Sequence, residues 1–82
     1  MKTYKSAFEL LTDDSARIKL YELKSELMNS INDQIYALKL TQLQASKVMK
    51  VTQARVSNVS TGRISRFTYD LLFVMYERIK EA

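Results

Sequence analysis

Five side chains that lie close together in the chain carry groups able to recognise bases in DNA. Gln53, Arg55, Ser57 and Asn58 supply two amides, a guanidinium and a hydroxyl, and Ala54 supplies a methyl group. Amides pair with adenine, a guanidinium pairs with guanine, and a small apolar group fits the thymine methyl group in the major groove. We therefore take these five residues as candidate base contacts, with Arg55 also able to clamp a phosphate.

A short helix is expected to precede these residues, from Thr41 to Met49. The Thr41 hydroxyl can cap its start by accepting a hydrogen bond from a free backbone N–H one turn later. Ala45, Val48 and Met49 then share one helical face, which predicts that this face is buried.

The five candidate residues fall on a second short helix, from Thr52 to Ser60, which Thr52 can cap in the same way. Val56 and Val59 are three residues apart and should point inward, which leaves the polar residues outside. Gly62, the only glycine in the chain, supplies a left-handed stop. Residues 41–61 therefore read as a helix-turn-helix.

The motif resembles the phage-repressor/Cro class, often called XRE-type. The matching run is Leu-Thr-Gln-x-x-Ala-(small)-x-x-Met-x-Val-Thr-Gln-x-Arg-Val-Ser-x-(apolar)-x-x-Gly, from Leu40 to Gly62. The following segment, Gly62 to Thr68, is similar to the HigA-like antitoxins. The resemblance implies an all-α, lambda-repressor-like fold of four or five helices. It also implies that Gln42 contacts a phosphate. The chain departs from the pattern at Lys50, which occupies the turn position where members of this class usually have glycine.

Charge is concentrated on the motif. The chain has a formal net charge of +4, and residues 41–66 contain five basic side chains and no acidic one. A localised basic patch is expected where phosphates are met. The candidate phosphate contacts are Thr41, Gln42, Lys47, Arg63 and Arg66.

Composition excludes several classes of function. The 82-residue chain has no cysteine and no histidine, which excludes a zinc site and a thiol or imidazole nucleophile. The acidic pairs Asp13–Asp14 and Glu22–Glu26 have neither a metal partner nor a phosphate-binding loop beside them. We therefore expect that the protein is not an enzyme and binds no metal and no cofactor. No run approaches the ~20 apolar residues of a membrane span, and no signal peptide is visible. Together with the missing cysteines, this predicts a cytoplasmic protein.

The remaining chain predicts two further helices in one domain, residues 1–82. The first runs from Thr12 to Lys39 and is capped by Thr12. It is either continuous or broken at residues 29–33. A stripe of apolar residues at helical spacing runs through these positions without a gap, which favours a continuous helix. The stripe consists of Leu20, Leu23, Leu27, Ile31, Ile35 and Leu38, widened by Ile18, Tyr21, Met28 and Tyr36. The last helix spans residues 68–81, with Thr68 as its cap. Its predicted buried face consists of Leu72, Met75, Tyr76 and Ile79, with Leu71 at the edge, and leaves Phe73 and Val74 outside.

Residues 1–29 form an extension that the DNA-binding unit does not need. Its leucine stripe requires cover, and we expect it to contact a second copy of the chain, a toxin, or both, with Tyr4 and Phe8 beside it. An arm packed on its own domain is the alternative for residues 1–11.

Three functions follow from these observations. The first is a homodimeric repressor that binds a palindromic site in double-stranded DNA. The second, implied by the resemblance, is an antitoxin that neutralises a ribonuclease toxin and represses its own operon. The third is a protein–protein adaptor that has lost DNA binding, against which the basic motif argues.

Overall fold

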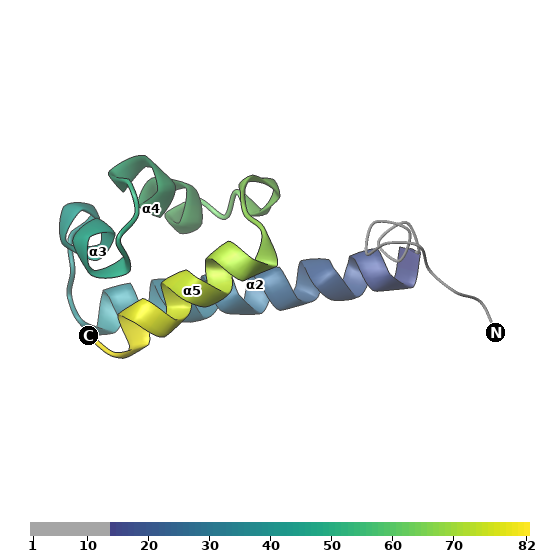
Figure 1. Ribbon diagram of the computed structural model, residues 1–82, viewed down its shortest axis with the longest axis horizontal. Helices are drawn as coiled ribbons and strands as arrows, with labels where there is room; N and C mark the ends of the chain where they lie inside the picture. Colours follow the sequence, from purple (N-terminus) through teal and green to yellow (C-terminus); the bar gives the residue numbers. More distant parts are fainter. Residues whose placement is uncertain (1–13) are drawn as a thin grey trace.

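A computed structural model describes residues 14–82, and over this range the chain folds into helices without strands (Figure 1). The elements are α2 (Asp14–Ala37), α3 (Gln42–Met49), α4 (Gln53–Ser60), the 3-10 turn η1 (Ile64–Arg66) and α5 (Tyr69–Lys80). The predicted all-helical class is confirmed. The expectations for Tyr4, Phe8 and the cap at Thr12 lie outside the described residues.

The long helix α2 is the base on which α5, α4 and η1 pack, and α3 packs on α4 and α5. α5 lies along the C-terminal half of α2 (Figure 1). The N-terminal half of α2 extends past the start of α5, so its first turns project from the body of the domain.

α2 runs without a break through residues 29–33, which confirms that the helix is continuous. The amide of Asn32 is not used as a cap, because its Nδ2 donates to the Val59 carbonyl at 3.1 Å. The helix ends at Ala37, two residues earlier than predicted. Lys39 turns the backbone left-handed (φ 56°), and the Leu40 N–H donates to the Ile35 carbonyl at 3.0 Å.

The predicted apolar stripe of α2 is too wide. Tyr36 was expected to extend it but is 86% exposed, and Leu38 lies outside the helix. Ile18 and Tyr21 are also exposed. At 100° per residue, Tyr36 and Ile18 point well away from the face that carries Ile31, so only one side of α2 meets the core.

The core forms where all four helices meet, and the largest fully buried side chains come from each of them. They are Ile31, Met49, Leu72, Met75, Ile79, Val56 and Val59. Each belongs to the apolar face predicted for its helix. Burying an aliphatic side chain of this size stabilises the fold by about 1.5–3 kcal/mol, so the core fixes how α3 and α4 are presented.

The segment between α4 and α5 contains a left-handed glycine followed by a 3-10 turn. Gly62 takes the left-handed conformation expected of it (φ 73°), and η1 follows, with the Phe67 N–H donating to the Ile64 carbonyl at 3.2 Å. Phe67 is buried. Thr68 then caps α5 by accepting from the Leu71 N–H at 3.2 Å, as predicted. Phe73 and Val74 are exposed, also as predicted.

Candidate nucleic-acid interface

The start of α3 is held by a reciprocal pair of hydrogen bonds. The Gln44 N–H donates to the Thr41 hydroxyl at 3.1 Å, and the Thr41 N–H donates to the Gln44 side-chain oxygen at 2.9 Å. This capping box confirms the cap predicted at Thr41. The Gln44 side chain is a second capping group that was not predicted from the sequence. The N–H groups of Gln42 and Leu43 lie in the first turn and have no intrahelical partner, which leaves two donors facing outward.

The turn between α3 and α4 is left-handed at Lys50, with φ 58° and ψ 44°. Lys50 therefore adopts the geometry that glycine adopts without strain, at a cost on the order of 1 kcal/mol. The turn is closed by the Val51 N–H, which donates to the Ser46 carbonyl at 3.0 Å. Ser46 is buried, and its hydroxyl donates to the Leu43 carbonyl at 2.6 Å, so a polar side chain is tolerated there.

α4 starts at the predicted cap and turns its two valines inward. The Arg55 N–H donates to the Thr52 hydroxyl at 3.1 Å, and Val56 and Val59 are fully buried. Gln53 and Ala54 are exposed at the start of the helix. The N-terminal end of α4 therefore presents an amide and a methyl group to solvent, and the inner face of the helix rests on the core.

The other three candidate base contacts are less exposed than the sequence predicted. Ser57, Asn58 and Arg55 are half-buried. The guanidinium carbon of Arg55 lies 6.0 Å from the centre of the Phe67 ring, a distance compatible with a cation–π contact. Arg55 is thus directed toward the segment that follows η1, and its position relies on a residue twelve places further along the chain. Periodicity within α4 could not reveal this contact.

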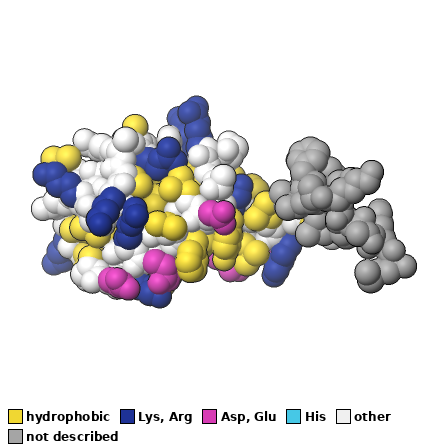
Figure 2. Space-filling model, in the orientation of Figure 1, with side chains coloured by type: hydrophobic (Ala, Val, Ile, Leu, Met, Phe, Trp, Pro, Cys, Tyr) yellow, Lys and Arg dark blue, Asp and Glu magenta, His cyan; other side chains and the backbone are white. Residues whose placement is uncertain are grey.

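All the cations predicted to meet phosphates are exposed. Lys47 lies on α3, Arg63 follows Gly62, and Arg66 ends η1. Figure 2 shows Lys and Arg side chains over the part of the molecule formed by α3 and α4, whereas Asp and Glu lie mainly along α2 and α5. These cations are therefore available to an anionic ligand.

One ion pair is present within residues 14–82, and it lies away from the motif. Lys80 donates to Glu77 at 2.8 Å on α5. This hydrogen bond and the Glu77 charge raise the pKa of Lys80 above its ordinary value.

Two polar side chains outside the motif hold it in place, and the sequence did not single out either for this role. Arg78 of α5 donates from Nη1 to the Met49 carbonyl at 3.0 Å, which caps the C-terminal end of α3. Asn32 of α2 holds the last turn of α4 through the Val59 carbonyl. In each contact the two residues are more than twenty positions apart in the sequence. The sequence indicates only that Arg78 is a basic residue in the last turn of α5, and it gives no signal for the contact of Asn32.

Residues 14–82 contain no group of three or more acidic residues placed to hold a metal ion. None of the helices described is long and apolar enough to cross a membrane.

A comparison with known protein families identifies a family to which this chain is similar. A family described as a helix-turn-helix domain matches residues 9–80, which is most of the chain and includes the motif and the helices around it. No curated protein and no solved structure matches significantly.

Proposed function

The chain belongs to this family of helix-turn-helix domains, and from that premise we propose that it is a homodimeric transcriptional repressor of the phage-repressor type. In this proposal it binds a palindromic site in double-stranded DNA and represses by occluding the promoter. α4 enters the major groove with its N-terminal end foremost, and α3 crosses the backbone above it.

The observation that carries the proposal is the contrast between the two faces of α4. Its inner face is fully buried through Val56 and Val59, while Gln53 and Ala54 stand exposed at its start. The exposed cations Lys47, Arg63 and Arg66 lie on the elements before and after it. The N-terminal end of α4 is polar and uncharged, and cations lie on the neighbouring elements. This arrangement suits DNA, whose base edges lie within the groove and whose phosphates lie on either side of it.

The side chains divide into two groups under this proposal. Gln53 and Ala54 read bases, with Ser57 and Asn58 further along the groove and Arg55 either on a guanine or on the neighbouring phosphate. Thr41, Gln42 and the outward N–H groups of the first turn of α3 bind a phosphate at the helix N-terminus. Lys47, Arg63 and Arg66 supply further phosphate contacts.

Dimerisation follows from the small number of base contacts. One α4 helix offers five candidate residues, too few for a long recognition sequence. Two copies bound to a palindrome make twice as many base contacts as one. The free-energy penalties for mismatched base pairs at separate positions are roughly additive, so the dimer discriminates more strongly between DNA sequences than one copy does.

Selection of bound sequences from a random double-stranded DNA pool tests the proposal. We expect enrichment of an inverted repeat, and affinity for it above that for unselected DNA by a factor of about 10³ or more. No enrichment, or equal binding to all sequences, contradicts sequence-specific repression.

A second candidate function is that of an antitoxin that also binds a ribonuclease toxin. The observation favouring it is the pair Phe73 and Val74 on α5, which are 47% and 40% exposed and belong to neither the core nor the DNA face. Exposed apolar neighbours of this kind suit a protein contact. Co-purification with the product of an adjacent small gene, lost in Phe73→Asp, tests it.

A further inference from the structure

Arg55 occupies a boundary position on α4. The buried direction of this helix lies between Val56 and Val59. At 100° per residue, Arg55 is turned about 70° from that direction, whereas Ala54 is turned about 170° from it. This difference accounts for the half-buried state of Arg55 and the exposure of Ala54. The Arg55 side chain therefore leaves α4 from its flank and not from its outermost face.

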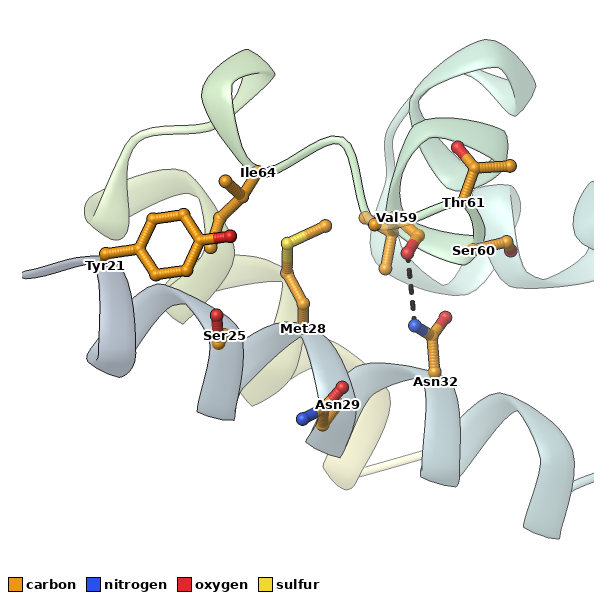
Figure 3. Close-up of a pocket in the computed structure, with 10 residues that line it drawn as sticks. Tyr21, Ser25, Met28, Asn29, Asn32, Val59, Ser60, Thr61 and Ile64 are labelled. Atoms are coloured by element: carbon orange, nitrogen blue, oxygen red, sulfur yellow. Dashed lines mark hydrogen bonds between the residues drawn. The ribbon is translucent and has the colours of Figure 1, made fainter.

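The rotation of α4 that sets this direction is fixed by its contacts with α2. Asn32 of α2 donates from Nδ2 to the Val59 carbonyl at 3.1 Å, as the dashed line in Figure 3 shows. Met28 of α2 and Ile64 of η1 line the pocket beside this bond. α4 and η1 are thus held on the same helix, so the flank of α4 keeps its orientation toward the segment that follows η1.

A buried aromatic ring in that segment holds the guanidinium of Arg55. The guanidinium carbon lies 6.0 Å from the centre of the Phe67 ring, and Phe67 is 3% exposed. The Phe67 N–H donates to the Ile64 carbonyl at 3.2 Å, and the ring belongs to the same core cluster as Val56 and Val59. The ring therefore gives Arg55 a fixed support.

The donors of the guanidinium are not used within the described chain. Arg55 donates from its backbone N–H to Thr52, but its side chain has no hydrogen-bond or ion-pair partner among residues 14–82. The sequence has no acidic residue from 41 to 66. A ring attracts the charge and leaves the five N–H donors without an oxygen acceptor. Arg55 is thus a held cation whose donors are free for an anion.

We propose that Arg55 binds a DNA phosphate and that Phe67 is the positioning residue that holds it for this contact. A helix in the major groove turns its outermost residues to the bases, while its flanks face the sugar–phosphate walls of the groove. Arg55 leaves from a flank, and a guanidinium binds phosphate through two parallel hydrogen bonds. The exposed cation Arg66 immediately precedes Phe67 and can meet the same wall. This inference rests on the proposed function and selects between the two contacts open to Arg55.

The role of Phe67 follows from conformational entropy. A guanidinium that is held before binding loses less rotamer freedom when it meets its phosphate. Without the ring, Arg55 keeps its charge but must be ordered during binding, so affinity falls. Because phosphates are the same in every sequence, the loss is equal on all DNA.

The phosphate contact is tested with the full chain by fluorescence anisotropy on the selected site and on DNA of unrelated sequence. We expect Arg55→Ala to weaken binding to both by the same factor, about tenfold. The slope of log affinity against log salt should become shallower by about 2 for a dimer. Lys19→Ala removes an exposed cation from α2 and is the matched control, with no change in either quantity. A loss confined to the selected site, with altered preference at one base pair, assigns Arg55 to a base and overturns the phosphate contact.

The positioning role is tested with Phe67→Leu and Phe67→Met, which remove the ring, and Phe67→Tyr, which keeps it. The control Ile79→Val reduces another buried side chain of the same core. We expect the two ring-free variants to weaken binding to both DNAs about fivefold, and Phe67→Tyr and Ile79→Val to stay close to wild type. In an Arg55→Ala background, Phe67→Leu should have no further effect. Circular dichroism at the assay temperature checks that each variant is folded.

Two outcomes contradict the positioning role while the proposed function stands. If Phe67→Leu weakens binding by the same factor with and without Arg55, Phe67 acts through the fold and not through Arg55. If the ring-free variants bind as wild type does, Arg55 needs no support. A wild-type chain that binds no DNA contradicts the proposed function itself, and this inference with it.

Discussion

Gln53 is the amide exposed at the start of α4, so its role can be separated from stability. Its side chain makes no core contact, and Gln53→Ala should leave the free energy of unfolding nearly unchanged. If it reads a base, the same change weakens binding to the selected site by about 1–3 kcal/mol and relaxes the choice at one position per half-site. Competition binding against single-base variants measures this. An equal loss on selected and random DNA would assign Gln53 to the phosphate contacts.

Lys50 carries a conformational cost that glycine would remove. Its left-handed φ of 58° predicts that Lys50→Gly stabilises the fold by up to about 1 kcal/mol. The matched control is Lys47→Gly, in the helical part of α3, which should destabilise by about 1 kcal/mol. Urea denaturation of both variants gives the comparison. Destabilisation by Lys50→Gly would mean that the lysine side chain makes a stabilising contact that outweighs the backbone cost.

Arg78 shows how a residue outside the motif fixes its geometry. Removing its hydrogen bond to the Met49 carbonyl leaves the end of α3 without this donor, and Arg78→Ala should cost about 1–3 kcal/mol because the donor is charged. Lys80→Ala, at an exposed position on the same helix, is the control and should cost less than about 0.5 kcal/mol. Thermal unfolding measures both, and equal effects would deny Arg78 this role.

At the scale of elements, α2 and α4 are joined by a polar contact as well as by the core. Asn32→Ala removes the donor to the Val59 carbonyl, and we expect a loss of about 1–2 kcal/mol. Asn29→Ala changes the same residue type one turn earlier, at an exposed position, and should stay within about 0.5 kcal/mol of wild type. Denaturant midpoints measure the difference. If the two variants match, the contact contributes nothing to stability.

Local signals placed the elements well. Thr41, Thr52 and Thr68 each cap the helix that they were predicted to cap, because a hydroxyl at a helix start needs only backbone one turn away. Gly62 likewise takes the left-handed conformation, which depends on its own missing side chain. These features are decided within a few residues and can be read from the sequence.

Contacts between distant segments could not be predicted in the same way. The contact of Arg55 with the Phe67 ring and the hydrogen bond from Arg78 to the Met49 carbonyl depend on how the helices pack. The exposure of Tyr36 has the same origin, because the stripe on α2 shows which residues are apolar but not how wide a face α5 and α4 cover. The candidate site was therefore located from sequence, while its supports were not.

At the scale of the whole molecule, charge is divided between two sides. The segment from α3 to η1 carries exposed cations and no acidic side chain, whereas α2 and α5 carry acidic side chains together with cations such as Lys19 and Lys80 (Figure 2). This separation orients the molecule as it approaches DNA, because the motif side is attracted to phosphates and the α2 side is not.

Salt dependence measures how many of these cations meet phosphates. If three to four phosphates are neutralised per subunit, a dimer should show a slope near −6 in a plot of log affinity against log salt concentration. Lys47→Gln removes one cation per subunit from the motif side and should make the slope shallower by about 2. Lys19→Gln removes an exposed cation from α2 and should leave the slope unchanged. Fluorescence anisotropy over a range of salt concentrations tests all three proteins. A wild-type slope near zero would refute DNA binding through this face, and equal slopes for the two variants would place Lys47 away from the phosphates.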